Sequence, residues 1–300
     1  MGKLNLVVLL PSIILMIACC NDNPLPTHEN KLKGKLKTFE DEFLTSSISN
    51  DSAVRFYFMY DSLNGILKNV SIKIQLNNVD TIVPVFTINK DINGDLYVYM
   101  QPFLSNSTFQ RFKISATGKR INSVVGLDTV NNTETVVAYA KYSTNIIDSS
   151  FDVGYFLNYN IRFSDFVFSN QDCTNYSVNS IVQSISPPYN TYGAHTRMSV
   201  NYINDIRKNK LFMQNAMDAS GWFGYGLLLY FLSVDDYYMI PPNQHLISDI
   251  TTTYTEYDDT LITRYSYQYS GSDVTSVKRT FFSLADTSIK TEYYQRMTYY

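Results

Sequence analysis

The stretch from residue 55 to residue 74 decides the fold and reads Arg55-Phe-Tyr-Phe-Met-Tyr-Asp-Ser-Leu-Asn-Gly-Ile-Leu-Lys-Asn-Val-Ser-Ile-Lys-Ile74. Aromatic and β-branched residues fill its two arms, and these residue types favour strands. Asn64-Gly65 lies between the arms, and both residues tolerate positive φ, which is a hairpin signal. Apolar residues in the second arm alternate with polar ones, as in a strand with one buried face. The stretch therefore predicts a β-hairpin.

The same pattern returns along most of the chain. The other copies are residues 85–100 with a turn at Asn93-Gly94, 112–125 with a turn near Gly118, 264–278 with a turn at Gly271, and, more weakly, 198–212 with a turn at Asn209. Tyr265, Tyr267 and Tyr269 should share one face because side chains alternate along a strand. The spacing is too irregular for a solenoid. We therefore predict a mainly β fold, a curved antiparallel sheet of successive hairpins.

One segment breaks the β pattern. It reads Ser220-Gly-Trp-Phe-Gly-Tyr-Gly-Leu-Leu-Leu-Tyr-Phe-Leu-Ser-Val234. Its apolar residues recur at helix-like intervals, although each of its three glycines weakens a helix by about 1 kcal/mol. A membrane-spanning helix needs roughly 20 apolar residues, more than this run offers. We predict one short helical insert near residues 222–234, packed on the sheet.

The composition agrees with a half-buried sheet and excludes some functions. Aromatic residues make up 15% of the chain, with 25 Tyr and 18 Phe, and the formal net charge is −3. No basic region of the kind that binds nucleic acid is present, so we expect no nucleic-acid partner. Of the three cysteines, only Cys173 lies outside the N-terminal region. We expect it to be a lone thiol rather than part of a disulfide framework.

The N-terminus has the three parts of an export signal. Lys3 is followed by an apolar run over residues 4–17, which is too short to span a membrane. Met16-Ile17-Ala18-Cys19 resembles the bacterial lipobox, and this resemblance implies cleavage before Cys19 and a lipid on its sulfur. Cys20 is the alternative acceptor, and an ordinary secretory signal is the alternative to a lipid anchor. After cleavage, Cys20 would be the second residue of the mature chain. An inner-membrane retention signal has an aspartate at that position, so the cysteine favours the outer membrane.

Three regions follow from these patterns. We expect a signal peptide over residues 1–18, a flexible tether over 19–38, and a single antiparallel β domain over 39–300, with one candidate subdivision near 185–190. The tether carries four lysines between residues 31 and 37. These lysines either are solvated within a flexible tether or lie close to anionic lipid headgroups.

The sequence of the predicted hairpin also resembles that of a known group of proteins. Tyr60-Asp61, Gly65-Ile66-Leu67 and Val70 resemble the YD-type repeats of bacterial surface proteins. The whole layout, from lipobox to the final Tyr-x-Tyr-x-Tyr hairpin, is similar to Bacteroidota exported lipoproteins of unknown function with degenerate YD-like hairpin repeats. The resemblance covers most of residues 40–300, but the tether here is basic rather than acidic. It implies a curved antiparallel sheet with no assigned activity.

A short sequence signal for O-glycosylation agrees with the resemblance to Bacteroidota exported proteins. Asp followed by Ser or Thr and then a small or aliphatic residue resembles the O-glycosylation signal of Bacteroidota exported proteins. The resemblance gives five candidate acceptors, Ser52, Ser62, Thr81, Thr129 and Thr260.

The chain has no recognisable catalytic or metal-binding motif. The patterns His-Glu-x-x-His, Cys-x-x-Cys and Gly-x-Ser-x-Gly are missing from the sequence. Asp235-Asp236 and Asp258-Asp259 are adjacent carboxylates, but neighbours on a strand point to opposite faces and do not converge. A Ser/His/Asp site using His195 or His245 stays open as an alternative. We expect no catalytic residue, no bound metal and no cofactor.

Aromatic residues around the insert are the remaining candidates for a ligand site. Trp222, Tyr225, Tyr237 and Tyr238 cluster there in the sequence. Exposed rings of this kind stack on sugars, whereas tyrosines in a β protein more often form cross-strand pairs that stabilise the sheet. Both interpretations stay open.

We expect an outer-membrane-anchored envelope lipoprotein that acts as a non-enzymatic binding or assembly module. Its partners would be the membrane, through the lipid, and a glycan or another envelope protein. Two alternatives stay open: a polysaccharide-acting hydrolase that uses acidic residues, and a purely structural envelope component. The sequence leaves the periplasmic and surface-facing orientations equally open.

Overall fold

The structure is a computed structural model of the 300-residue chain. It describes residues 31–42, 54–76, 79–92, 95–101, 109–128, 130–140, 142–143, 146–147, 151–155, 159–183, 191–205, 231–239, 243–255, 259–288 and 290–300. The signal peptide, Cys19 and most of the predicted tether lie outside these ranges.

The described chain is almost entirely β-structure. Its strands are β1 (Leu36–Asp41), β2 (Val54–Tyr60), β3 (Leu67–Leu76), β4 (Val79–Lys90), β5 (Leu96–Met100), β6 (Arg111–Thr117), β7 (Arg120–Asp128), β8 (Thr133–Tyr139), β9 (Tyr142–Ser143), β10 (Ile146–Ile147), β11 (Phe151–Tyr155), β12 (Tyr159–Ser169), β13 (Asp172–Gln183), β14 (Thr191–Tyr202), β15 (Ile247–Tyr254), β16 (Asp259–Ser270), β17 (Asp273–Ser283) and β18 (Lys290–Tyr299). The predicted antiparallel sheet of successive hairpins is confirmed.

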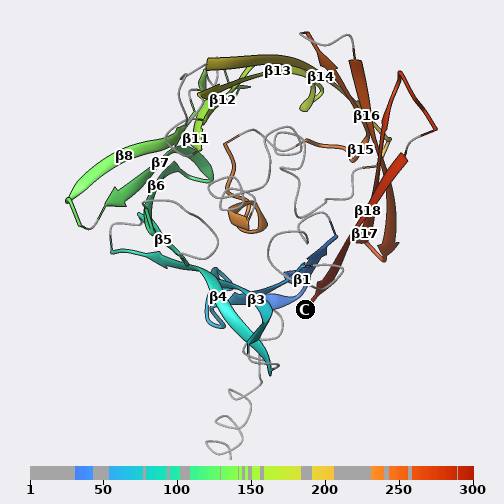
Figure 1. Cartoon of the computed structure of the whole chain (residues 1–300). Helices are drawn as coiled ribbons and strands as arrows, with labels where there is room; N and C mark the ends of the chain where they lie inside the picture. The colour runs from blue at the N-terminus through green and yellow to red at the C-terminus, as the bar shows by residue number, and fades with distance from the viewer. Residues whose placement is uncertain are drawn as a thin grey trace, which may run out of the picture.

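The sheet closes on itself into a barrel, a feature that the sequence patterns did not predict. Strands β1 to β8 and β11 to β18 follow one another around the ring, and β9 with β10 forms a separate two-stranded sheet. The first strand pairs antiparallel with the last, with Phe39 opposite Met297 and Asp41 opposite Gln295. Figure 1 looks down the ring, with blue β1 next to red β18. Closure leaves neither terminal strand with a free edge, which is the physical benefit of a barrel.

Alternation along each strand separates an apolar inner wall from a polar outer wall. On β2, Phe56 and Phe58 are buried, whereas Arg55 and Met59 are exposed. Phe56 lies opposite Ile72 of β3, so the buried positions of neighbouring strands share one face. The same alternation continues on β5, where the buried positions 96, 98 and 100 flank half-buried and exposed tyrosines. A period of two therefore places the core inside the ring.

The predicted hairpins are confirmed where the structure describes them. Gly65, Gly118 and Gly271 occur in the turns β2–β3, β6–β7 and β16–β17, each with a positive φ. Asn64 does not share that conformation. Its side-chain Oδ1 instead accepts a hydrogen bond from the Ile66 N–H at 2.9 Å. The turns predicted at residues 93–94 and 209 lie outside the described residues, although β4 and β5 do pair as a hairpin.

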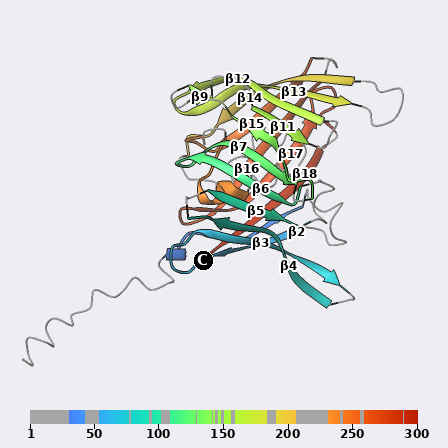
Figure 2. The same cartoon turned by 90° about the vertical axis from the view of Figure 1, so that its left-hand side faces the viewer.

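The antiparallel order gives the barrel two different ends. Because the strands alternate in direction, the turns after β2, β6, β12 and β16 lie at the same end as the start of β1 and the end of β18. We call this the turn end. The two chain ends meet here, since the Tyr300 N–H donates to the carbonyl of Lys35 at 3.0 Å. Figure 2 shows the barrel from the side, with the C-terminus at this end.

A segment between β14 and β15 enters the ring from the turn end. Its described part, residues 231–239, is called the plug segment here, and it appears in orange inside the ring of Figure 1. Residues 231–232 are helical and continue into a 3-10 turn, Ser233–Asp235. The helix predicted near 222–234 is thus present at its described end, while residues 222–230 lie outside the described ranges.

Phe231 joins the plug segment to the inner wall. Its ring centroid lies 4.8 Å from that of Phe56, 5.5 Å from that of Phe58 and 5.6 Å from that of Phe86. All four rings are at most 1% exposed. Aromatic pairs at these spacings contribute beyond their buried area. The interior is therefore a packed apolar core on the side of β2 and β4.

The N-terminal boundary falls earlier than the predicted start of the β domain. Strand β1 begins at Leu36, so the barrel includes the last residues of the stretch expected to be a tether. None of the helical segments within the described residues has the length and apolar character that crossing a membrane requires.

We predict that Phe231→Ala lowers the free energy of unfolding by about 3–5 kcal/mol, because it leaves a cavity among three buried rings. Ile92→Ala is the control, since Ile92 is fully exposed in the β4–β5 turn. Urea unfolding followed by tyrosine fluorescence measures both. Equal effects of the two changes would show that the plug segment is not packed in the core.

Candidate functional site

The contact between the plug segment and the wall centres on one buried carboxylate, Asp235. Its side chain is 7% exposed, and Oδ1 lies 3.0 Å from Lys35 Nζ. Its Oδ2 accepts a hydrogen bond from the Leu67 N–H at 2.6 Å, and Lys119 Nζ donates to its carbonyl oxygen at 2.6 Å. A buried charge is tolerated only when it is paired and hydrogen-bonded, and these contacts meet that condition. Asp235 thus joins the plug to three separate parts of the wall.

Backbone hydrogen bonds also join the plug segment to the wall. Ile121 N–H donates to the carbonyl of Tyr238 at 2.7 Å, and Tyr238 N–H donates to the carbonyl of Lys119 at 3.0 Å. The plug therefore adds a short parallel bridge to the start of β7. The Lys119 ammonium lies 4.2 Å from the ring centre of Tyr237. Burial, followed by the charge of Asp235, raises the pKa of Tyr237 above its ordinary value.

These contacts bear on the aromatic residues that the sequence marked as ligand candidates. Tyr237 and Tyr238 are half-buried, and the contacts described for them are with the wall and within the plug. Trp222 and Tyr225 lie outside the described residues. The structure thus assigns the two described tyrosines to the plug junction, and the stacking role of the four residues stays a prediction.

Tyrosine hydroxyls elsewhere in the barrel stabilise the sheet by donating to backbone carbonyls. The donors and acceptors are Tyr60 and Leu36 at 2.9 Å, Tyr202 and Cys173 at 2.6 Å, Tyr267 and Ile247 at 2.8 Å, Tyr299 and Val274 at 2.6 Å, and Tyr300 and Phe58 at 3.0 Å. Burial raises the pKa of Tyr60, Tyr202 and Tyr299 well above 10. A neutral hydroxyl is the form that can donate, so burial and hydrogen bonding favour the same protonation state.

A second polar group lies on the inner face of the wall, beside the pairing of β1 with β18. Asp41, Arg279 and Gln295 are each 0% exposed. Gln295 Nε2 donates to Asp41 Oδ2 at 2.6 Å, and Arg279 Nη2 lies 3.4 Å from the same oxygen. They share the inner face with Phe39, two residues before Asp41 on β1. Removing one member of such a group leaves the others buried and poorly paired, which is costly.

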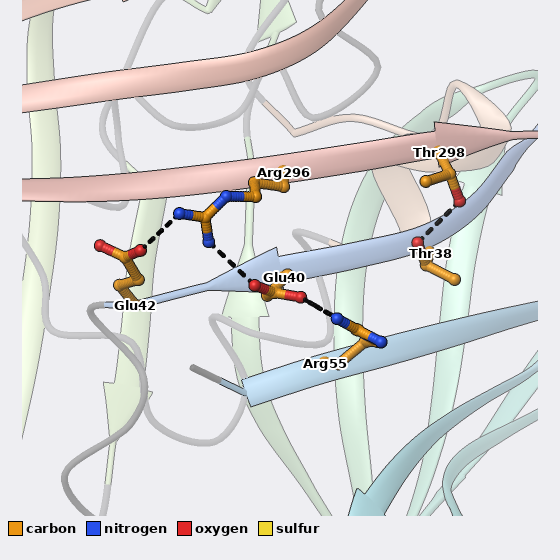
Figure 3. A network of polar contacts seen from close by, with 6 residues as sticks. All are labelled: Thr38, Glu40, Glu42, Arg55, Arg296 and Thr298. Carbon is orange, nitrogen blue, oxygen red and sulfur yellow. Dashed lines mark hydrogen bonds and ion pairs between the residues drawn. The ribbon is translucent and has the colours of Figure 1, made fainter. Parts of the chain in front are cut away.

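The outer wall at the same seam carries a charged network, shown in Figure 3. Glu40 of β1 lies between two arginines, Arg55 of β2 and Arg296 of β18, which occupy the directly opposite positions of the two neighbouring strands. Glu40 Oε2 is 2.5 Å from Arg55 Nη2, and Oε1 is 2.9 Å from Arg296 Nη1. Arg296 Nη2 also binds Glu42 Oε1 at 2.9 Å. Two carboxylates and two guanidinium groups thus alternate across three strands.

The polar outer wall extends around the ring. Further ion pairs join Lys73 to Asp80, Lys113 to Asp95 and Lys278 to Glu292. Arg111 lies against the rings of Tyr97 and Tyr99, at 4.9 Å and 5.4 Å from their centres. Thr38 and Thr298 share a hydrogen bond of 2.7 Å across the seam in Figure 3. Ion pairs, hydroxyl groups and tyrosine rings thus lie on the outer wall at several places around the ring.

His245 forms a carboxylate–imidazole pair with Asp172. Its Nδ1 lies 2.7 Å from Asp172 Oδ2, and the N–H groups of Gln244 and His245 donate to Asp172 Oδ1. Asn243 Oδ1 accepts from the Cys173 N–H at 2.9 Å. These contacts fasten the returning end of the insert to the start of β13. The described residues supply this pair but no nucleophile against it, and His195 contacts Asn179 at a different place on the wall.

Cys173 is a free, buried thiol. Burial raises its pKa to about 12, and its Sγ lies 3.5 Å from the carbonyl oxygen of Asn175. A thiol in that state is a poor nucleophile. Within the described residues, no group of three or more His, Cys, Asp or Glu side chains could hold a metal ion.

The five candidate glycosylation acceptors lie in different environments. Ser62 is exposed in the β2–β3 turn, whereas Thr81 and Thr260 are half-buried on β4 and β16. Ser52 and Thr129 lie outside the described residues, as does Asp258. Asp236 is exposed after the 3-10 turn, with φ of 66°, while Asp235 is buried. Of that adjacent pair, sequence reasoning missed the role of Asp235, because its partner Lys35 is distant in sequence.

We predict that Asp235→Ala lowers the free energy of unfolding by about 2–4 kcal/mol, because it removes a buried carboxylate that neutralises a lysine and binds a backbone N–H. After Lys35→Met the carboxylate keeps the hydrogen bond from the Leu67 N–H, and Lys35 itself is 31% exposed, so this change should cost less than Asp235→Ala. Denaturant unfolding of both variants tests the difference. A cost for Lys35→Met equal to that of Asp235→Ala would contradict the central role of the carboxylate.

We also predict acid sensitivity from the seam network. Burial alone would raise the pKa of Glu40, but the hydrogen bonds and charges of Arg55 and Arg296 lower it below the ordinary value of 4.5. The network therefore contributes stability above about pH 4.5 and loses it as the pH falls through the lowered pKa. Glu40→Gln should show a smaller loss of stability between pH 7 and pH 3 than the unchanged chain. Arg55→Gln should reduce the same loss, and an unchanged pH profile in both variants would contradict this assignment.

Comparisons with known proteins bear on the fold. No protein-family model matches the chain, and no curated protein matches it in sequence. Among solved structures, the chain is similar to the crystal structure of a porin-like protein from Bacteroides vulgatus ATCC 8482, with a TM-score of 0.56 and 11% sequence identity. The match covers 88% of this chain and 98% of that one. At this identity the likeness shows a shared fold.

Proposed function

We propose that this protein is an envelope lipoprotein, held at the outer membrane by lipid on Cys19, whose barrel acts as a non-enzymatic binding or assembly module. The observation that carries the proposal is the polarity of the two walls. The outer wall bears the ion pairs around Glu40, Lys73, Lys113 and Lys278, and the inner wall bears the apolar core.

This polarity is the reverse of that in a membrane-spanning barrel. Such barrels present an apolar band to lipid and a polar interior, and a lysine or arginine at the lipid midplane costs about 2–4 kcal/mol. Arg55, Lys73, Lys278 and Arg296 lie on the outer wall, between one-third and about one-half exposed. These charges favour water around the barrel. Membrane attachment is then left to the N-terminal lipid.

The interior supports a scaffold rather than a channel. Phe231 and Asp235 fix the plug segment to the wall by ring packing and by a buried ion pair. A channel would need a polar path through this region. The rigid barrel instead presents its outer wall and its loops to other molecules, as expected of a binding or assembly module. A glycan and another envelope protein are the two partner classes that we propose.

The position of the N-terminus supports an anchor beside the turn end. Gly34 N–H donates to the carbonyl of Tyr300 at 3.3 Å, so the chain leaves the barrel where its two ends meet. The chain between Cys19 and Lys31 can span at most about 40 Å. The turn end would therefore lie near the membrane, with the opposite loops directed away from it.

We predict that the unchanged protein fractionates with the outer membrane and that Cys19→Ala releases it as a folded soluble protein. Lipid supplies the attachment, at about 0.8 kcal/mol for each buried CH₂, and the charged wall supplies none. Membrane flotation and labelling with a radioactive fatty acid measure the two effects.

Cys20→Ala is the matched control and should stay labelled and membrane-bound. If Cys19→Ala still floats with the membrane, the wall itself is embedded and the proposal fails. If Cys20→Ala loses the label and Cys19→Ala keeps it, the anchor exists but is attached to the neighbouring residue.

A further inference from the structure

The two ends of the barrel differ in the charge that they expose. Among the described residues, the exposed lysines of the turn end are Lys31, Lys33, Lys37, Lys68, Lys90 and Lys119, and the exposed carboxylates in that half of the barrel are Asp165 and Asp236. Around the opposite hairpins β3–β4, β7–β8 and β17–β18, the exposed carboxylates Asp80, Glu134, Asp286 and Glu292 outnumber the exposed lysines Lys73 and Lys290. The basic end is therefore the end from which the chain leaves toward Cys19.

Apolar side chains are exposed at the centre of this basic region. Leu63 and Ile66 of the β2–β3 turn are 67% and 38% exposed, and Ile92 of the β4–β5 turn is fully exposed. We call these three residues the apolar tips. The two turns are neighbours, because β3 pairs with β4 and Asn69 near the start of β3 lies opposite Thr87 near the end of β4.

Lysines flank the apolar tips on several sides. Lys68 follows the first turn and Lys90 precedes the second, and both are exposed. The ammonium group of Lys31 donates to the carbonyl of Leu63, so the start of the described chain lies against the first turn. Lys33 is exposed two residues further on. We call the apolar tips together with Lys31, Lys33, Lys68 and Lys90 the tip surface.

The carboxylates of the same two turns bind groups of the barrel itself. Asp61 Oδ1 accepts the N–H of Leu63 at 2.8 Å, and Asp91 Oδ1 accepts the N–H of Asp95 at 2.9 Å. The carboxylate of Asp95 in turn lies 2.8 Å from Lys113 Nζ. All three aspartates are half-buried, whereas the four lysines of the tip surface are exposed. The surface that meets another molecule is therefore basic, with apolar side chains at its centre.

We propose that the tip surface docks the barrel onto a membrane that contains anionic phospholipid. Apolar side chains beside lysines are the composition by which proteins bind in the interface of a bilayer, with the apolar groups among the headgroups. Lysines near a membrane are attracted by anionic headgroups, and this attraction acts within about a Debye length of the surface. The inference deepens the proposed anchoring through Cys19 and rests on it.

The position of the anchor selects a membrane as the partner. The chain between Cys19 and Lys31 spans at most about 40 Å, and it starts at the tip surface itself. A lipid on Cys19 would hold this surface within reach of the bilayer, which raises its effective concentration there. The carboxylates of the opposite end would be repelled by anionic headgroups. Docking thus fixes the orientation of the barrel, with the opposite hairpins directed away from the membrane.

The docking contact is weak without the acyl chains. It consists of three side chains and four lysines, and salt screens the attraction between exposed charges. The chain without lipid should therefore leave the membrane at physiological ionic strength, as predicted for Cys19→Ala. Acyl chains retain the protein, and the tip surface orients it.

The test uses residues 19–300 with Cys19→Ser and Cys20→Ser, so that no lipid is attached. At low salt, this chain should sediment with phosphatidylcholine vesicles that contain about 40% phosphatidylglycerol, at least about tenfold more than with pure phosphatidylcholine, and about 0.5 M NaCl should release it. The double variant Lys33→Glu with Lys90→Glu should weaken binding at least about tenfold because it reverses two charges of the surface. Leu63→Ser with Ile92→Ser should weaken it by about fivefold or more.

Matched controls lie at the opposite end of the barrel. Lys73→Glu with Lys290→Glu makes the same change of net charge, and Val79→Ser with Leu284→Ser removes two valine and leucine side chains that are 62% and 53% exposed. Both controls should bind like the starting chain, and unfolding curves should show that all variants fold.

Two results would overturn the docking surface: no binding to the anionic vesicles at low salt, and equal losses in the lysine variants of the two ends. Weaker binding in the lysine variant with no change in the Leu63 and Ile92 variant would overturn the insertion of the apolar tips. None of these results bears on the lipid at Cys19, which flotation and fatty-acid labelling test separately.

Discussion

Pairing of the first strand with the last is the constraint on which the rest of the structure depends. Strand β1 pairs with β2 on one side, and it has a neighbour on the other side because β18 returns to it more than 250 residues later in the chain. That pairing is stabilised on both faces. Outside, Glu40 joins Arg55 to Arg296 across three strands, and inside, Asp41 binds Gln295 beside Arg279. Opposite charges in register make the closed ring more stable than a ring shifted by one residue, since such a shift would turn the carboxylates to the wrong faces.

Closure then creates an interior that must be filled. The inner wall is lined with phenylalanine, valine and isoleucine, and an empty ring of such residues would expose them to water. Phe231 of the plug segment packs against this surface. The buried carboxylate of Asp235 is stabilised by the ammonium group of Lys35 and by the backbone N–H of Leu67. The returning end of the insert is held at the start of β13, where Asp172 binds Gln244 and His245. Plug and wall are therefore parts of one core.

The shared fold with a porin-like protein does not carry function with it, because a fold can serve unrelated activities. What separates a pore from a scaffold is the placement of polarity on the two walls. Here the inside is lined mainly with apolar side chains, apart from the buried groups around Asp41 and Asp235, and the outer wall carries the exposed ion pairs.

The sequence by itself determined the local structure. The period-two pattern of residues 55–74 and the glycines at 65, 118 and 271 specify strands and turns through contacts between near neighbours, and the structure has them in place. The N-terminal lipobox is likewise a local sequence pattern that does not depend on the fold, and it stays a prediction. Closure of the sheet, the pairing of Asp235 with Lys35 and the seam network were decided only by the tertiary structure. Each joins residues about 200 or more positions apart, and local propensity carries no information about which distant strand completes a ring.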